Sequence, residues 1–80
     1  MKARVVVTLK PGVLDPQGQA IEGSLGGLGF TGVSAVRQGK IFDLEVDATD
    51  AEDARSKVDS MCTRLLANTV IENYSVEISE

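Results

Sequence analysis

Apolar residues alternate with more polar ones at both ends of the chain. The odd positions from Ala3 to Leu9 are apolar, and the even positions between them are largely polar. The stretch NYSVEIS, from Asn73 to Ser79, has the same period of two. Because side chains of a strand point alternately to its two faces, these patterns predict strands over residues 3–9 and 73–79.

A helical period follows the first strand. Ile21, Leu25 and Leu28 fall at i, i+4 and i+7, the spacing of an amphipathic helix. The helix is weak by propensity, because each glycine in it costs about 1 kcal/mol relative to alanine. Gly29 is expected to end it in a left-handed conformation, with Phe30 folding back onto the last turn.

The stretch VSAVRQGKIFDLEV, from Val33 to Val46, predicts a β-hairpin. A two-residue turn at Gln38-Gly39 would pair Val36 with Ile41 and Val33 with Leu44. This register sorts most apolar residues onto one face, which supports it. The residues on that face are Val33, Ala35, Phe42, Leu44 and Val46.

A second helix is predicted from TDAEDA to Asn68. Thr49 and Glu52 have the spacing of a capping box, and nearby aspartates suit the positive end of the helix dipole. Asn68 is a plausible stop. The expected buried stripe consists of Ala54, Val58, Met61, Cys62 and Leu65.

The predicted order is β-α-β-β-α-β, within a single domain over residues 1–80. Right-handed crossovers then give an α+β, ferredoxin-like sandwich, with a four-stranded antiparallel sheet and both helices on one face. The open face would carry Val6, Val36 and Ile41. We expect another subunit to cover this face or a sheet edge, because it is too apolar for full exposure.

Composition removes several classes of function. The chain has 80 residues, a net charge of −4, no histidine and one cysteine. An acidic chain with three aromatic residues is a poor nucleic-acid binder, so we expect no nucleic-acid partner. No apolar run is long enough to cross a membrane, and a lone cysteine without a signal peptide favours the cytoplasm. The lack of histidine and of clustered cysteines removes the usual zinc sites.

Three motifs suggest chemistry but are better explained by folding. GLGFTG, from Gly27 to Gly32, has dinucleotide-binding spacing, yet it follows a helix instead of opening one. Cys62 lies on an apolar stripe with no histidine to activate it, so core packing is the better interpretation. Asp50, Glu52 and Asp53 begin a helix, where capping explains them better than metal binding. We therefore expect no catalytic residue, cofactor or metal on this chain.

Two other motifs are less fully explained. In LKPGVLDPQGQAI, Pro11-Gly12 predicts a turn, while Asp15 as N-cap and Pro16 at the first helical position predict a helix start. Those roles do not account for so elaborate a loop. VRQGK, from Val36 to Lys40, is either a solubilising turn or a positive knob that meets carboxylates or phosphates of a partner.

These two motifs resemble the PurS family, the small subunit of phosphoribosylformylglycinamidine (FGAM) synthase. The family's Leu-Asp-Pro-Gln-Gly run is matched by residues 14–18, and its Val-Arg-x-Gly-Lys run by residues 36–40. The resemblance covers essentially the whole chain. One departure is Thr69, where relatives often have proline. The partner-binding candidates are Leu14, Asp15, Pro16, Gln17, Gly18, Arg37, Gly39 and Lys40.

The resemblance implies a place in de novo purine biosynthesis. In this family's enzyme a glutaminase subunit (PurQ) releases ammonia, and an ATP-dependent synthetase subunit (PurL) inserts it into formylglycinamide ribonucleotide. PurS is the non-catalytic bridging component, a homodimer or dimer of dimers that contacts both and assists ammonia transfer. ATP and magnesium would therefore bind to the synthetase subunit. An alternative resemblance is to ACT modules, which bind amino acids and share the element order and the Pro-Gly turn, but usually lack the Asp15-to-Gly18 insertion.

Overall fold

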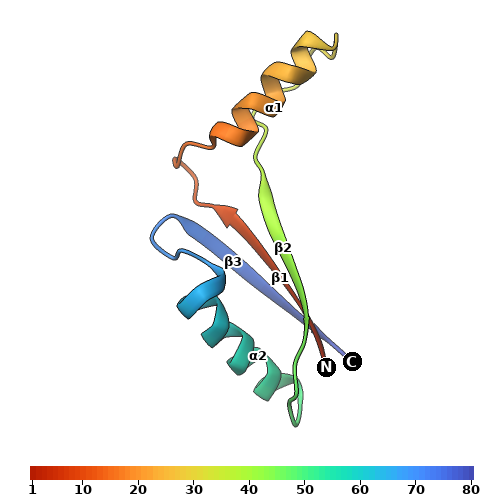
Figure 1. The fold of residues 1–80 in the computed structure, drawn as a ribbon, viewed down its shortest axis with the longest axis vertical. Helices are drawn as coiled ribbons and strands as arrows, with labels where there is room; N and C mark the ends of the chain where they lie inside the picture. Colours follow the sequence, from red (N-terminus) through yellow and green to blue (C-terminus); the bar gives the residue numbers. More distant parts are fainter.

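The computed structural model describes residues 1–80 as a small sheet with one packed helix and one projecting helix (Figure 1). The elements are β1 (Lys2–Leu9), α1 (Pro16–Gly27), β2 (Gly39–Glu45), α2 (Ala51–Met61), a π-helical turn (Cys62–Leu66) and β3 (Glu72–Ser79). The fold class is α+β, as predicted. Neither helix is long and apolar enough to span a membrane.

The sheet has three strands in the order β2-β1-β3, and both outer strands are antiparallel to β1. At the centre, Val5 lies opposite Phe42 on one side and Val76 on the other. Because paired residues share a face, the odd positions of β1 point to one side together with the even positions of the outer strands. The alternation predicted for the first and last strands is thereby confirmed.

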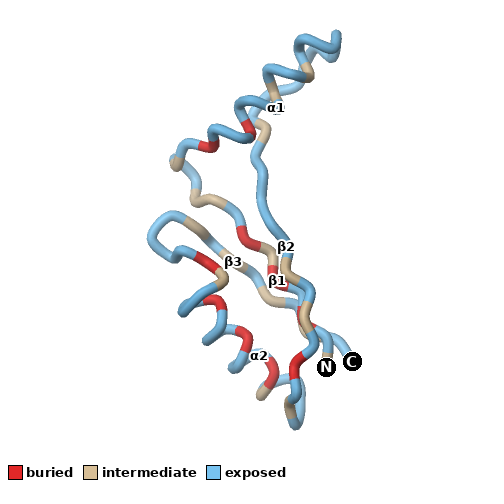
Figure 2. The backbone as a smooth tube through the Cα atoms, viewed as in Figure 1, coloured by how far each residue is buried: buried red, intermediate tan, exposed pale blue.

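The core lies between this face and α2 (Figure 2). It consists of Ala3, Val5, Val7, Val46, Val58, Cys62 and Ala67. Phe42 and Leu44 are half-buried against its margin. On the opposite face, Val6 is half-buried and its neighbour Ile41 is 57% exposed.

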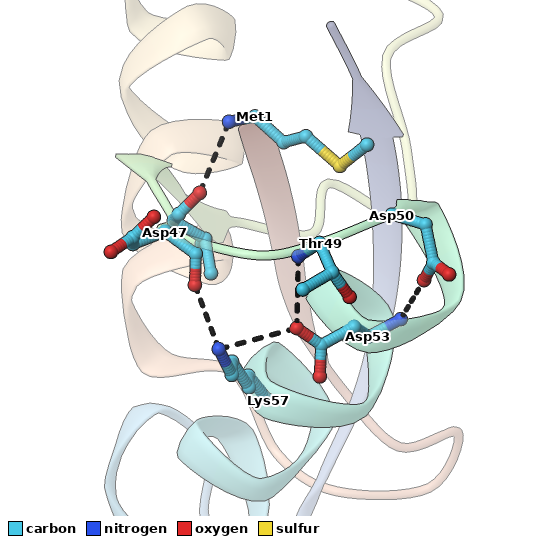
Figure 3. Close-up of polar contacts among 7 residues, drawn as sticks. Met1, Asp47, Thr49, Asp50, Asp53 and Lys57 are labelled. Atoms are coloured by element: carbon cyan, nitrogen blue, oxygen red, sulfur yellow. Dashed lines mark hydrogen bonds and ion pairs between the residues drawn. The ribbon is translucent and has the colours of Figure 1, made fainter.

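The start of α2 corrects the predicted capping box by one residue. Asp50, not Thr49, is the N-cap, and its carboxylate accepts from the amide of Asp53 at 2.8 Å. The Asp53 carboxylate in turn accepts from the Thr49 amide and lies 3.2 Å from the Lys57 ammonium (Figure 3). Lys57 also donates to the Asp47 carbonyl. An Asp-Asp pair therefore performs the reciprocal capping that was assigned to threonine and glutamate.

The end of α2 corrects the predicted buried stripe. Ala54, Val58 and Cys62 are fully buried, but Leu65 is 83% exposed. The reason is the π turn, which the amide of Ala67 closes on the carbonyl of Cys62. A turn with i→i+5 bonding carries one more residue than an α turn, so the phase of the helix shifts and Leu66 packs on the core instead.

Helix α1 does not lie on the sheet, which corrects the prediction of two helices on one face. It does not pack extensively on any strand, and it projects from one end of the molecule (Figure 1). The molecule measures 51 × 26 × 15 Å, with a radius of gyration of 16.0 Å. A compact chain of this length would have a radius of about 12 Å. The single chain is therefore extended.

The predicted hairpin and fourth strand are also absent. Residues 33–38 form no strand, and β2 begins at Gly39, opposite Thr8 of β1. The preceding segment returns alongside α1, where the amide of Val36 donates to the Glu22 carboxylate at 3.1 Å. Ala35 has a φ of 55°, which interrupts any extended pairing. Bonding to the helix thus replaces the ladder that a hairpin would have formed.

Candidate functional site

The two motifs singled out from the sequence lie next to each other where the chain passes between the sheet and α1. The first passage begins with the turn from Lys10 to Val13, closed by a bond from the Val13 amide to the Lys10 carbonyl at 3.1 Å. Gly12 has a φ of 87°, as the third position of a type II turn requires, after Pro11. The predicted Pro-Gly turn is confirmed.

Asp15 connects the two motifs. It is 5% exposed and is the N-cap of α1, where one carboxylate oxygen accepts from the Gly18 amide at 2.8 Å. The other oxygen accepts from the amide of Gln38, in the second motif, at 2.7 Å. The Gln38 and Gly18 amides hold the pKa of Asp15 below its ordinary value, against the opposing effect of burial, and the charge of Arg37 adds to this.

Arg37 binds the first motif in return. Its guanidinium donates to the Val13 carbonyl at 2.8 Å and to the Lys10 carbonyl at 3.1 Å. A planar guanidinium can reach two acceptors at once, which an ammonium group does less well. Arg37, a partner-binding candidate in the sequence, thus donates hydrogen bonds to the backbone of its own chain.

Lys40 lies on the core side of β2. Its ammonium is 3.6 Å from the Glu72 carboxylate and 5.8 Å from the centre of the Phe42 ring. The Glu72 carboxylate also accepts from the Asn68 amide at 2.7 Å. Lys40 therefore connects the two outer strands, β2 and β3, across β1, while its side chain remains half exposed.

The candidate residues divide into two groups by exposure. Asp15 and Gly18 are buried where the two motifs meet. Leu14 is 64% exposed, and Pro16 and Gln17 of the same motif are also exposed. Gly39, in the second motif, is exposed as well. An open cleft of about 210 Å³ lies here, lined by Val7, Leu9, Asp15, Gln17, Gln38, Gly39, Lys40 and Glu72.

The charged side chains where the two motifs meet, called the junction below, are engaged in structural bonds and not poised for catalysis. The Asp15 carboxylate is occupied by two backbone amides, and Lys40 is paired with Glu72. The thiol of Cys62 lies elsewhere, fully buried in the core, and burial raises its pKa, with the Asp59 charge adding to the effect. A nucleophile needs an adjacent base and access to substrate.

The glycine motif at the end of α1 is a helix stop. The amide of Phe30 donates to the Leu25 carbonyl, and the amide of Gly29 to the Gly26 carbonyl. With Gly29 at a φ of 95°, this is a Schellman ending. The prediction that GLGFTG ends a helix instead of opening one is confirmed.

Sequence reasoning missed two features of the arm, defined here as residues 16–36. Glu22 is the only charged residue of α1, and it bonds to the returning chain. The apolar stripe of α1 stays exposed: Leu28 is 73% exposed and Phe30 is 59% exposed. A helix with one charge and so many glycines was the available signal, because little in it favours a stable solvated surface.

Comparison with known proteins settles the family. The family model of PurS, described as phosphoribosylformylglycinamidine (FGAM) synthase, matches residues 2–80. The chain belongs to the PurS family. PurS is a subunit of FGAM synthase, an enzyme of purine biosynthesis. Of the two resemblances raised by the sequence, the match favours PurS over the ACT modules.

Individual PurS proteins match over most of their length. The PurS subunit of Synechocystis sp. is 53% identical over 76 residues, which cover 95% of this chain and 76% of that protein. The Mycobacterium leprae PurS is 53% identical over 75 residues, or 94% and 91% of the two chains.

Solved PurS structures share the fold. The Bacillus subtilis PurS superposes with a TM-score of 0.88 at 44% identity, covering 99% of this chain and 98% of that one. A chain in the structure of PurLQS from Thermotoga maritima has a TM-score of 0.87 at 37% identity, covering 95% and 93%. The extended arrangement of sheet and arm is therefore shared by PurS chains of known structure.

Proposed function

We propose that this chain is the non-catalytic bridging subunit of FGAM synthase, which binds the PurL and PurQ subunits and assists the transfer of ammonia between them. The observation that carries this proposal is its similarity, over 95% of its length, to a chain of the Thermotoga maritima PurLQS structure. ATP and magnesium then bind to PurL, and the complex works in the cytoplasm.

The exposed residues of the first motif are the proposed contact with a larger subunit. Leu14 projects into solvent directly beside the buried Asp15, and Pro16 and Gln17 continue the exposed surface. Asp15, Gly18 and Arg37 fix the backbone of this turn through their hydrogen bonds. A rigid turn that presents an apolar side chain can dock with little loss of conformational entropy.

The arm is the proposed site of self-association, as a homodimer or a dimer of dimers. Four apolar side chains of the arm are each at least 41% exposed, and α1 does not pack extensively on any strand of its own chain. They are Ile21, Leu28, Phe30 and Val33. Burying apolar surface is worth about 25 cal/mol per Å², so a second copy of this chain would stabilise the arm. Multi-angle light scattering should show an oligomer at micromolar concentration.

A matched pair of variants tests the arm. Leu28→Glu places a charge on the exposed stripe and should weaken self-association. Leu65→Glu is the control, because this leucine is also highly exposed (83%, against 73% for Leu28) but lies in the π turn beyond α2. A wild-type chain that stays monomeric, or a Leu28→Glu variant that associates as the wild type does, would contradict the proposed interface.

Co-purification with PurL and PurQ, followed by activity assays, tests the bridging role. Replacing Leu14 and Gln17 by alanine should lower glutamine-dependent activity more than ammonia-dependent activity, because only the former needs the three subunits joined. Arg64→Ala, an exposed change in the π turn, is the control. Equal activities with both nitrogen sources in the Leu14/Gln17 variant would count against the proposal. The Arg37/Lys40 double alanine variant should show the same bias, together with a loosened junction.

A further inference from the structure

The arm is joined to the rest of the molecule by two passages of the chain. The outgoing passage runs from Lys10 to Asp15 and leads into α1. The returning passage runs from Arg37 to Gly39 and leads into β2 (Figure 1). Since α1 packs extensively on neither a strand nor α2, the direction of the arm depends on these passages.

Each passage is bonded to the other by one charged side chain. Asp15, in the outgoing passage, accepts from the amide of Gln38 in the returning one. Arg37, in the returning passage, donates to the Lys10 and Val13 carbonyls of the outgoing one. The bonds run in opposite senses, so neither passage can slide along the other without breaking a charge-assisted hydrogen bond.

The bonded pair of passages is also anchored to the sheet. The Lys10 amide donates to the carbonyl of Ile71, next to β3, at 2.8 Å. The carbonyl of the same residue accepts from Arg37. A continuous series of hydrogen bonds therefore connects the edge of β3 to the outgoing passage, to Arg37 and to the base of α1.

The chemistry of both side chains is specific to this role. Asp15 offers an acceptor to each of two amides, whereas an asparagine would place an NH₂ group against one of them. Arg37 reaches two carbonyls with one planar group, which a lysine cannot reproduce. Charge alone would not require these residue types.

We propose that Asp15 and Arg37 form a latch that fixes the direction of the arm, so that its exposed apolar stripe is held in place for a second copy of the chain. They are positioning residues, which act through their hydrogen bonds to the chain's own backbone. The purpose of the latch rests on the proposed self-association, but its existence does not.

The test measures the direction of the arm within one chain. Spin labels are attached at Gly23→Cys on the arm and Ser75→Cys on β3, in a Cys62→Ala background, and labelled chains are diluted with unlabelled ones. Gly23 has open space around it, and Ser75 is exposed. In Asp15→Asn and Arg37→Lys, the distance distribution should become wider than in the parent chain. Asp50→Asn, which makes the same charge-removing change at the N-cap of α2, is the matched control and should leave the distance distribution unchanged.

Hydrogen exchange provides a second measurement without labels. The Gly18 and Gln38 amides should exchange about tenfold faster in Asp15→Asn, as expected when a charged acceptor is lost. Amides of α2 and β3 should keep their protection, which shows that the sheet remains folded. Unchanged distances and unchanged exchange at the junction in both variants would overturn the latch. A wild-type chain that is monomeric would overturn the proposed self-association alone.

Discussion

The carbonyl oxygen of Val36 faces the α-carbon of Gly18 so closely that a methyl group cannot fit between them. Gly18 lies in the first turn of α1, and Val36 lies in the returning chain, which bonds to the same helix through Glu22. The contact is between backbone atoms, so no side-chain rotation can relieve it. Close approach, not a special backbone angle, is what requires glycine here.

Gly18→Ala should therefore separate the returning chain from α1 and lower the free energy of unfolding by about 1–3 kcal/mol, the usual cost of overpacking. Gly23→Ala is the control, because it lies in the same helix with open space around it. It should raise stability by up to about 1 kcal/mol through helix propensity. Urea unfolding of both variants at equal concentration checks this. A neutral Gly18→Ala would contradict the close approach.

The pH dependence of stability should report the bonds of Asp15. Amide donors hold its folded pKa below the ordinary 3.8, so its contribution is fully present above that value and is lost as the pH falls through the folded pKa. Asp43, paired with Arg4, and Asp53, bonded to the Thr49 amide, shift in the same direction. All three therefore predict a loss of stability in acid below about pH 4.

Asp15→Asn separates this contribution from the others. The variant should be less stable than the wild type at pH 6, and the difference should shrink as the pH is lowered below 3.8. Thermal unfolding between pH 2 and pH 6, followed by circular dichroism, measures both curves. A constant difference across that range would show that the Asp15 carboxylate is not held in its charged form by the junction.

Tyr74 should titrate unusually late. Its hydroxyl donates to the Asp59 carboxylate, and this bond, with burial and the Asp59 charge, raises its pKa from 10.0 to about 12. Because the folded pKa is raised, the stabilising contribution is present below pH 10 and is lost as the pH rises toward 12. Ultraviolet difference spectra should show one tyrosinate forming late. In Asp59→Asn the transition should move toward 10, whereas Asp50→Asn should leave it in place.

Much of the local structure could be predicted from the sequence, because its causes are local. Asp15 and Pro16 begin α1, and Gly29 ends it, through hydrogen bonds within a few residues. Alternation likewise predicted β1 and β3, whose odd and even positions meet different environments. The displaced cap of α2 shows the limit of such reasoning, since Thr49 and Asp50 both have acceptable side chains and only the backbone path selects one.

The arm could not be predicted, because its causes are distant in sequence. Gln-Gly is a good hairpin turn, and the pattern from Val33 to Val46 suits one. In the structure β2 pairs with β1 instead. Residues 33–38 return alongside α1, where the Val36 amide donates to Glu22 and the Gln38 amide donates to the N-cap, Asp15. Both candidate motifs were identified, but their contact with each other depends on this path. The partners of Arg37 are likewise distant in sequence, so no local pattern indicated its bonds to the Lys10 and Val13 carbonyls.

The π turn after α2 gives a prediction that the simple helical pattern would reverse. On that pattern Leu65 is buried and Leu66 is not, but the structure exposes Leu65 and packs Leu66 on the core. Leu66→Ala should therefore lower the free energy of unfolding by about 2 kcal/mol, which corresponds to roughly 10 °C in Tm for a domain of this size. Leu65→Ala should change it by less than about 0.5 kcal/mol. Thermal unfolding at one fixed concentration compares the two. Equal costs, or a larger cost for Leu65→Ala, would mean that the helix continues without the extra residue and that the phase shift at Cys62 does not occur.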